Sequence, residues 1–135
     1  MTDALLEELG KGGASLLVAK DRQVAAYHGR GVSDLYRLLT TQPERLLGAD
    51  VADKAVGAAA AALMILGGVR SVQTFLASEP ALRLFSDAAL PVHYVRREPV
   101  ILNRRGDGPC PLEARCKDLH TPAECLEEIS AFLSS

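Results

Sequence analysis

The chain has 135 residues, of which 48% are hydrophobic, with no Trp and only three Phe and three Tyr. This length predicts one domain, residues 1–135, whose core is built from Leu, Val, Ile and Ala side chains. The formal net charge of −2 argues against nonspecific binding of nucleic acid or of an anionic membrane, because both need a positive field.

The N-terminal stretch MTDALLEELGKGG carries acidic residues and has no long apolar run, so it does not resemble a signal peptide. The longest apolar run, residues 55–69, is shorter than the ~20 residues that span a bilayer. Both observations predict a soluble cytoplasmic protein. In that compartment Cys110, Cys116 and Cys125 are expected to be reduced thiols.

Caps, glycines and apolar periodicity predict alternating helices and strands. The expected helices are residues 2–9, 33–40, 54–66, 78–88, a short helix from 111, and 121–133. The expected extended segments are residues 14–20, 23–28, 46–51, 69–77, 92–95 and 99–102. Asp21 and Arg22 form the turn of a hairpin, and Thr121 with Glu124 has capping-box spacing. This order predicts a three-layer α/β/α sandwich with a mixed sheet, in which ligands bind where helices begin along one sheet edge.

The first candidate site residues lie at the expected start of the Ala-rich helix. Asp53 is predicted to cap this helix, and capping alone, worth about 0.5–2 kcal/mol, would account for it. Lys54 would then be the first helical residue, where its charge opposes the helix dipole. A solvated Lys54 is one explanation, whereas a carboxylate partner or an anionic ligand explains the position better.

The next helix is predicted to open with Ser78, Glu79 and Pro80. Ser78 is a cap, and an acid in the first turn is favourable in any helix. If adjacent strands lead into the two helices, Glu79 lies near Lys54. A Lys54–Glu79 pair is therefore a hypothesis for how the lysine is compensated.

The third candidate segment is the loop NRRGDGPCP, which begins at Asn103. Gly106 and Gly108 allow the backbone to approach a bound molecule closely, and Cys110 is predicted to cap the helix that starts at Pro111. A thiol there has a lowered pKa, and Glu113, one turn on, is a candidate base. The alternative is a turn with a buried, inert cysteine. The further loop residues assigned to ligand binding are Arg104 and Asp107.

No metal site is expected. His28, His93 and His120 lie in unrelated contexts, and a core or surface role accounts for each. Cys116 and Cys110 lack the spacing of a CxxC motif, which argues against zinc.

Three segments, VADKAVGAAAAALM, SEPAL and ILNRRGDGPCPLE, resemble in order and spacing the bacterial family called domain of unknown function eighteen-ninety-three. The resemblance implies the cytidine-deaminase-like fold, in agreement with the predicted sandwich. In the deaminases, H-x-E at one helix start and P-C-x-x-C at the next supply the zinc ligands and a proton-transferring Glu. Here the corresponding starts are residues 52–54 (ADK) and 78–80 (SEP), which do not retain those ligands.

Without a metal, nothing lowers the pKa of an attacking water, so this departure argues against hydrolytic deamination. The resemblance therefore implies a pocket without zinc or another cofactor. By analogy with folds of this type, it also suggests a homodimer.

Three functions stay open. The first is a metal-independent enzyme for a nucleotide-like or other small anionic ligand, with Cys110 as nucleophile, Glu113 or Asp53 as acid or base, and Lys54 stabilising charge. The second is a ligand-binding or sensor module in which the same groups only bind. The third is a scaffold that uses the edge of this pocket as a partner surface.

Overall fold

The computed structural model describes residues 4–29, 32–101, 111–116, 118–119 and 121–134. The elements in chain order are α1 (Ala4–Lys11), β1 (Leu16–Lys20), β2 (Gln23–Tyr27), α2 (Ser33–Thr41), a short 3₁₀ turn η1 (Pro43–Arg45), β3 (Asp50–Val56), α3 (Ala58–Leu66), β4 (Ser71–Ser78), α4 (Glu79–Asp87), β5 (Val92–Glu98), α5 (Pro111–Cys116) and α6 (Pro122–Ser134). None of these helices is both long and apolar enough to cross a membrane.

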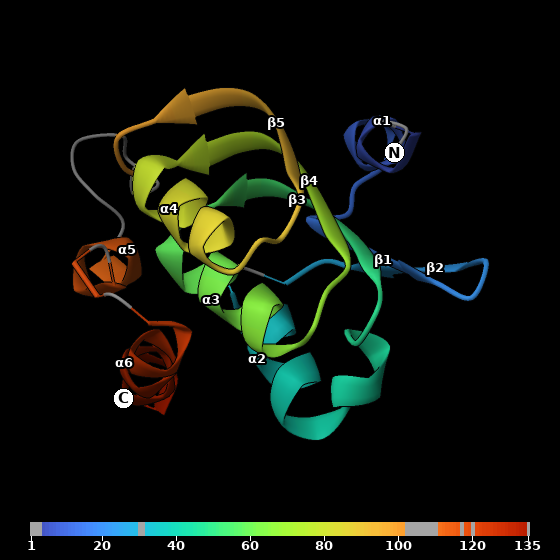
Figure 1. The fold of residues 1–135 in the computed structure, drawn as a ribbon. Helices are drawn as coiled ribbons and strands as arrows, with labels where there is room; N and C mark the ends of the chain where they lie inside the picture. The colour runs from blue at the N-terminus through green and yellow to red at the C-terminus, as the bar shows by residue number, and fades with distance from the viewer. Residues whose placement is uncertain (1–3, 30–31, 102–110, 117, 120, 135) are drawn as a thin grey trace.

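The sheet has five strands in the order β2-β1-β3-β4-β5. Strand β1 runs antiparallel to both of its neighbours, whereas β3, β4 and β5 are parallel. Helix α1 lies on one side of the sheet, and the other helices lie on the opposite side (Figure 1). The predicted three-layer α/β/α sandwich with a mixed sheet is therefore confirmed.

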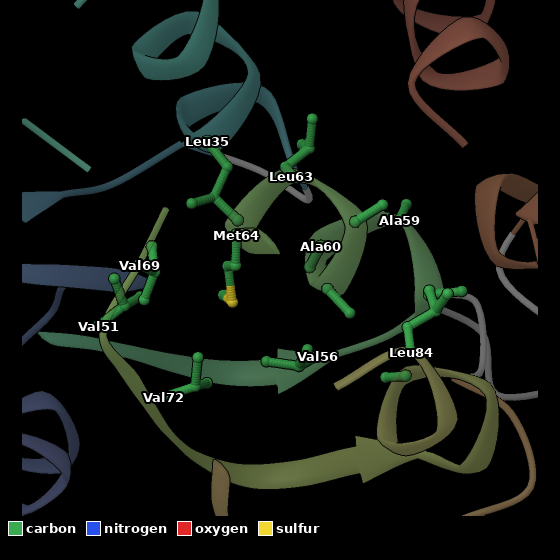
Figure 2. Packing of buried hydrophobic residues seen from close by; sticks show 14 of the residues in the cluster. Leu35, Val51, Val56, Ala59, Ala60, Leu63, Met64, Val69, Val72 and Leu84 are labelled. Carbon is green, nitrogen blue, oxygen red and sulfur yellow. The ribbon is translucent and has the colours of Figure 1, made fainter. Parts of the chain in front are cut away.

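The main core lies between α3 and the sheet. Seven of the nine residues of α3 are buried, and five of these are alanines, so the helix can approach the strands closely. Met64 points from α3 toward Val51 of β3 and Val72 of β4 (Figure 2). Helix α3 is thus fixed directly over the two central parallel strands.

A smaller core lies on the other face of the sheet, where Leu6 and Leu9 of α1 pack with Leu17 and Ala52. The Gln73 side chain, which is buried, accepts a hydrogen bond of 3.0 Å from the backbone N–H of Leu6. This bond ties the first helix to a central strand.

Several local predictions are confirmed. Asp21 and Arg22 have φ angles of 53° and 67°, the left-handed conformation that a two-residue hairpin turn requires. At the last helix, Thr121 Oγ1 accepts from the Glu124 N–H at 3.2 Å, and Glu124 Oε1 accepts from the Thr121 N–H at 3.1 Å. This reciprocal pair is the predicted capping box.

The predicted boundary between β3 and α3 is wrong. Asp53 and Lys54 do not open a helix, because β3 continues through them to Val56 and α3 begins at Ala58 with Gly57 as its N-cap. Pairing with β1 on one side and β4 on the other keeps this segment extended. Bonding to two neighbouring strands thus outweighs the helix propensity of the Ala-rich sequence.

Strand β5 is longer than predicted, since it extends to Glu98. Its last three residues are charged, a composition that an edge strand tolerates because its side chains reach solvent. The second predicted segment, 99–102, is not a strand at residues 99–101, and residue 102 lies outside the described residues.

We expect Met64→Ala to destabilise the protein by about 2–5 kcal/mol, since it leaves a cavity between α3 and the central strands. Leu66→Ala is the matched control, because Leu66 is on the same helix but 40% exposed. The control should change the free energy of unfolding by less than about 1 kcal/mol in urea titrations. Equal losses in both variants would contradict this packing.

Candidate functional site

The parallel strands β3 and β4 end at the same edge of the sheet. Strand β3 leads through Gly57 into α3, and β4 leads directly into α4. Because the strands are neighbours, the two helices begin side by side, as the sequence predicted. Each helix start presents backbone N–H groups that lack partners within the helix.

At the start of α3 these N–H groups meet Glu113 of α5. Glu113 is buried, and its Oε2 accepts a hydrogen bond of 2.6 Å from the backbone N–H of Ala58. The partial positive charge of a helix start favours a carboxylate at this position. A side chain from the far end of the chain therefore occupies the anion-binding position of α3.

Gly57 makes this contact possible. A Cβ atom at residue 57 would lie 2.2 Å from Glu113 Oε2, 2.9 Å from its Cδ and 3.1 Å from Ile101 Cγ1. The backbone of Gly57 is extended, with φ −97°, so this conformation does not itself require glycine. Glycine is needed at residue 57 because any side chain there would clash with the Glu113 carboxyl.

Ser78 connects the carboxyl group with α4. Its hydroxyl oxygen caps α4 by accepting from the Ala81 N–H at 3.2 Å, which confirms the predicted cap. The same hydroxyl group donates its proton to the Glu113 carboxyl, and this hydrogen bond lowers the pKa of the carboxyl. The two helix starts thus meet at one buried acid.

Burial raises the pKa of Glu113 above its ordinary value of 4.5, although the bonds from Ser78 and Ala58 lower it in part. Desolvation thus outweighs both hydrogen bonds. The other oxygen, Oε1, is buried and has no hydrogen-bond partner among the described residues. A carboxyl group with a raised pKa and a free oxygen can give or take a proton, the role expected for Glu113.

Asp53 lies in a different environment from the one predicted. It is in mid-strand, opposite Leu16 on one side and Thr74 on the other, so it does not cap a helix. Burial raises its pKa to about 7, the nearby charge of Asp34 adds to this, and the N–H groups of Lys54 and Ala55 lower it in part.

Asp34 is a buried residue of α2 that the sequence did not single out. It accepts from the Gly29 N–H at 2.7 Å and pairs with Arg37 at 3.2 Å. Asp53 and Asp34 therefore form an acidic pair on the α2 side of the sheet, and no local sequence signal links them.

The structure does not bring Lys54 to the site. Lys54 lies in β3 directly after Asp53, and its side chain is exposed. In the described part of the chain its ammonium group makes no ion pair. Glu79 pairs instead with Arg97 at a distance of 2.9 Å. The Lys54–Glu79 hypothesis is therefore wrong, although the predicted adjacency of their strands is right.

The predicted loop residues lie outside the described residues, so their role stays a prediction. They are Asn103, Arg104, Gly106, Asp107, Gly108 and Cys110. Within the described ranges, no three His, Cys, Asp or Glu side chains are grouped so as to hold a metal ion.

We expect Gly57→Ala to destabilise the protein by about 1–3 kcal/mol, because the new methyl group displaces the Glu113 carboxyl. In a Glu113→Ala background, where the carboxyl is absent, the same change should cost much less, because only the contact of 3.1 Å with Ile101 Cγ1 remains. Urea unfolding of the four proteins in this cycle measures the coupling between the two sites.

Gly13→Ala is the control for this cycle, since a Cβ at residue 13 would have no atom within 4 Å. Gly13→Ala should change the free energy of unfolding by the same amount in the parent protein and in Glu113→Ala. If Gly57→Ala cost the same free energy with and without the carboxyl, the contact would not be what requires glycine.

The raised pKa of Asp53 predicts a pH-dependent stability. The folded carboxyl holds its proton up to about pH 7, whereas an unfolded one releases it near 3.8, so stability falls as pH rises between these values. We expect Asp53→Asn to remove this loss, which at about 1.4 kcal/mol per pKa unit amounts to a few kcal/mol.

Urea midpoints measured between pH 5 and 8 test this expectation, with Asp50→Asn as the control. The pKa of Asp50 is lowered, first by its hydrogen bond from Arg70, so its contribution to stability is complete above about pH 5 and constant over the measured range. The control should therefore follow the pH slope of the parent protein. A parallel slope for Asp53→Asn would contradict the raised pKa.

Comparisons with known proteins agree with this fold. The profile of the family described as domain of unknown function (DUF1893) matches residues 4–133. The crystal structure of a DUF1893 family protein from Thermotoga maritima superposes with a TM-score of 0.86 and 24% identity, over 98% of this chain and 92% of that chain. RibD from Acinetobacter baumannii gives a TM-score of 0.44 at 14% identity, over 58% of this chain and 27% of that chain. No curated protein matches. The chain therefore belongs to the DUF1893 family.

Proposed function

We propose that the sheet edge where α3 and α4 begin binds a nucleotide-like or other small anionic ligand, and that Glu113 is the proton-transferring group there. One observation carries the proposal: Glu113 is a buried acid with a raised pKa whose Oε1 has no partner among the described residues. Structural carboxyls are normally fully hydrogen-bonded, and perturbed acids cluster at functional sites.

Other described groups at this edge support an anionic ligand. The start of α4 presents a helix N-terminus, at which Ser78 caps the Ala81 N–H and Pro80 has no N–H. Arg97, beside Ala77 in the sheet, supplies an exposed guanidinium that is paired with Glu79. On release from Glu79, Arg97 would take the charge-stabilising role first assigned to Lys54.

We extend the proposal to catalysis through Cys110, which directly precedes α5 in the sequence. Glu113, in the first turn of that helix, would then accept or return the proton of the reaction. The cytidine-deaminase-like origin of the fold, the absence of a zinc requirement, the homodimer and the cytoplasmic location belong to the same proposal. The SEP sequence at the start of α4, in place of P-C-x-x-C, supports the loss of zinc.

A binding module without catalysis is the second candidate. The bond from Ala58 to Glu113 favours it, because that bond also serves simply to hold α5 against α3. The rate of Cys110 alkylation separates the two functions. A thiol pKa clearly below about 8.5 supports catalysis, and an ordinary one supports binding alone.

A thermal-shift screen with nucleoside phosphates and nucleotide sugars tests the binding site. An anionic ligand beside Glu113 favours the protonated acid, so binding should take up a proton and weaken as the pH rises through the raised pKa of Glu113. Glu113→Gln, which keeps the shape without the titration, should bind with little dependence on pH.

Glu128→Gln is the matched control, since Glu128 is an acid on α6 that lies partly exposed beside Arg115. It should show the pH dependence of the parent protein. No shift with any of these compounds at any pH, or a pH dependence that survives in Glu113→Gln, would contradict the proposed site. Shifts that a zinc chelator abolishes would contradict zinc independence.

A further inference from the structure

The two edges of the sheet differ in composition. Strand β5 ends in three charged residues, Arg96, Arg97 and Glu98, which oppose pairing with another chain. Strand β2 has the sequence QVAAY, with neither a charged residue nor a proline. Among the described strands β2 pairs with β1 alone, so its outer side is open. The composition of β2 therefore lacks the features with which proteins prevent edge strands from pairing.

The described helices leave the β2 edge uncovered. Helix α1 packs mainly on β1, β3 and β4. The β1–β2 hairpin extends beyond the helices, on the side of the molecule away from α5 and α6 (Figure 1). Val24 is 50% exposed, and its neighbours Gln23 and Ala26 are exposed as well. An uncharged strand is thus accessible to a partner along its length.

The hairpin geometry determines which backbone groups of β2 face outward. Lys20 lies opposite Gln23 across the two-residue turn, and residues that flank such a turn form a hydrogen-bonded pair. Because hydrogen-bonded pairs alternate along the strands, Gln23, Ala25 and Tyr27 turn their N–H and C=O groups toward β1. The N–H and C=O groups of Val24 and Ala26 point the other way. The edge therefore presents two donors and two acceptors.

We propose that β2 pairs antiparallel with β2 of a second copy of this chain, about a two-fold axis at Ala25, so that the two sheets become one. In this register Val24 lies opposite Ala26 of the second copy, and Ala26 lies opposite Val24. The outward donors of each copy then meet the outward acceptors of the other. This inference rests on the homodimer in the proposed function, to which it assigns a surface, and it does not depend on Glu113.

The strand is complementary to itself, which favours a second copy over another partner. Small or apolar side chains, Val24 and Ala26, face each other, and the residue on the axis is the small Ala25. Since β2 carries no charge, the pairing brings no like charges of the two strands together. The net charge of −2 per chain adds only a weak repulsion between the copies.

This register also leaves room for α1. Strand β1 and its copy would be three strand spacings apart, about 14 Å. Helix α1 packs on β1, β3 and β4, which lie progressively farther from the axis. Because a helix is about 10 Å wide, the two copies of α1 fit on one face of the joined sheet without overlap.

A hollow beside β2 would receive a side chain of the second copy. Its volume is about 430 Å³, and its lining includes Gln23 and Tyr27 of the strand with Glu44 and Arg45 of η1. In the proposed register Tyr27 of the second copy lies opposite Gln23. Its ring would therefore reach this hollow and add contact area to the backbone pairing.

Cross-linking at residue 25 tests the register. On the two-fold axis Ala25 meets its own copy in a non-hydrogen-bonded pair, whose Cα atoms are about 4.5 Å apart, a distance that a disulfide can bridge. In the Cys110→Ser chain the remaining Cys116 and Cys125 are buried, so Ala25→Cys adds one accessible thiol. With oxidised glutathione we expect a covalent dimer on non-reducing electrophoresis, which dithiothreitol reverses.

Val24→Cys in the same chain is the matched control. Residue 24 is more exposed than Ala25, but it lies diagonal to its own copy, with Cα atoms roughly 7–8 Å apart, too far for a disulfide. The control should therefore stay monomeric on the same gel. Random collisions would cross-link the more exposed residue 24 first. Cross-linking at residue 24 that equals or exceeds that at residue 25 would overturn the proposal, even if the protein dimerises through another surface.

Light scattering after gel filtration tests the interface without engineered thiols. We expect twice the chain mass of 14.4 kDa between micromolar and millimolar concentrations. Val24→Lys puts two like charges at diagonal positions across the axis and should shift the protein to the mass of one chain. Val95→Lys is the matched control, since Val95 is 66% exposed on the other edge strand, and it should stay dimeric.

A parent chain that is monomeric at every concentration, or a dimer that Val24→Lys leaves intact, would overturn the proposal. The cross-linking comparison remains decisive if Val24→Lys does not fold. The thermal-shift screen reports on the Glu113 site independently of these measurements, so the two proposals can fail separately.

Discussion

The hydrogen bond from the Ala58 N–H to the Glu113 carboxyl is the contact on which the candidate site depends. It joins the start of α3, in the middle of the sequence, to α5 near its end. Gly57 leaves the space that the carboxyl fills, and Ser78 adds the start of α4 to the same point. One acid thereby connects the two helices that follow the central parallel strands.

Two opposing effects act on this acid, and their magnitudes decide its behaviour. The helix start and the Ser78 hydroxyl favour the charged form, whereas removal from water favours the neutral form. Desolvation is the larger effect, so the pKa of Glu113 is raised. Asp53 shows the same outcome in the sheet. The domain thus holds two acids with raised pKa values, and each costs stability when it ionises in the folded state.

Local sequence signals predicted most of the fold, because turns and caps depend on neighbouring residues. The Asp21–Arg22 hairpin, the Ser78 cap and the Thr121 capping box follow from such signals. The start of α3 was placed too early, since the pairing of β3 on both sides, antiparallel with β1 and parallel with β4, is a nonlocal effect. Glu113 was chosen from the sequence for its position in a short helix. Its partner, Ala58, could not be predicted, because a backbone N–H carries no sequence signal and the contact joins residues 55 positions apart in the chain.

A carbon-13 NMR titration of the Glu113 side-chain carboxyl measures the central claim directly, since it reports the protonation of this one group. The account predicts a midpoint above the ordinary value of 4.5, with a shift toward 4.5 in Gly57→Ala, where the carboxyl is displaced toward water. A midpoint at or below 4.5 in the parent protein would contradict it. Glu113 would then be an ordinary ionised cap on α3, and the proton-transfer site would be lost.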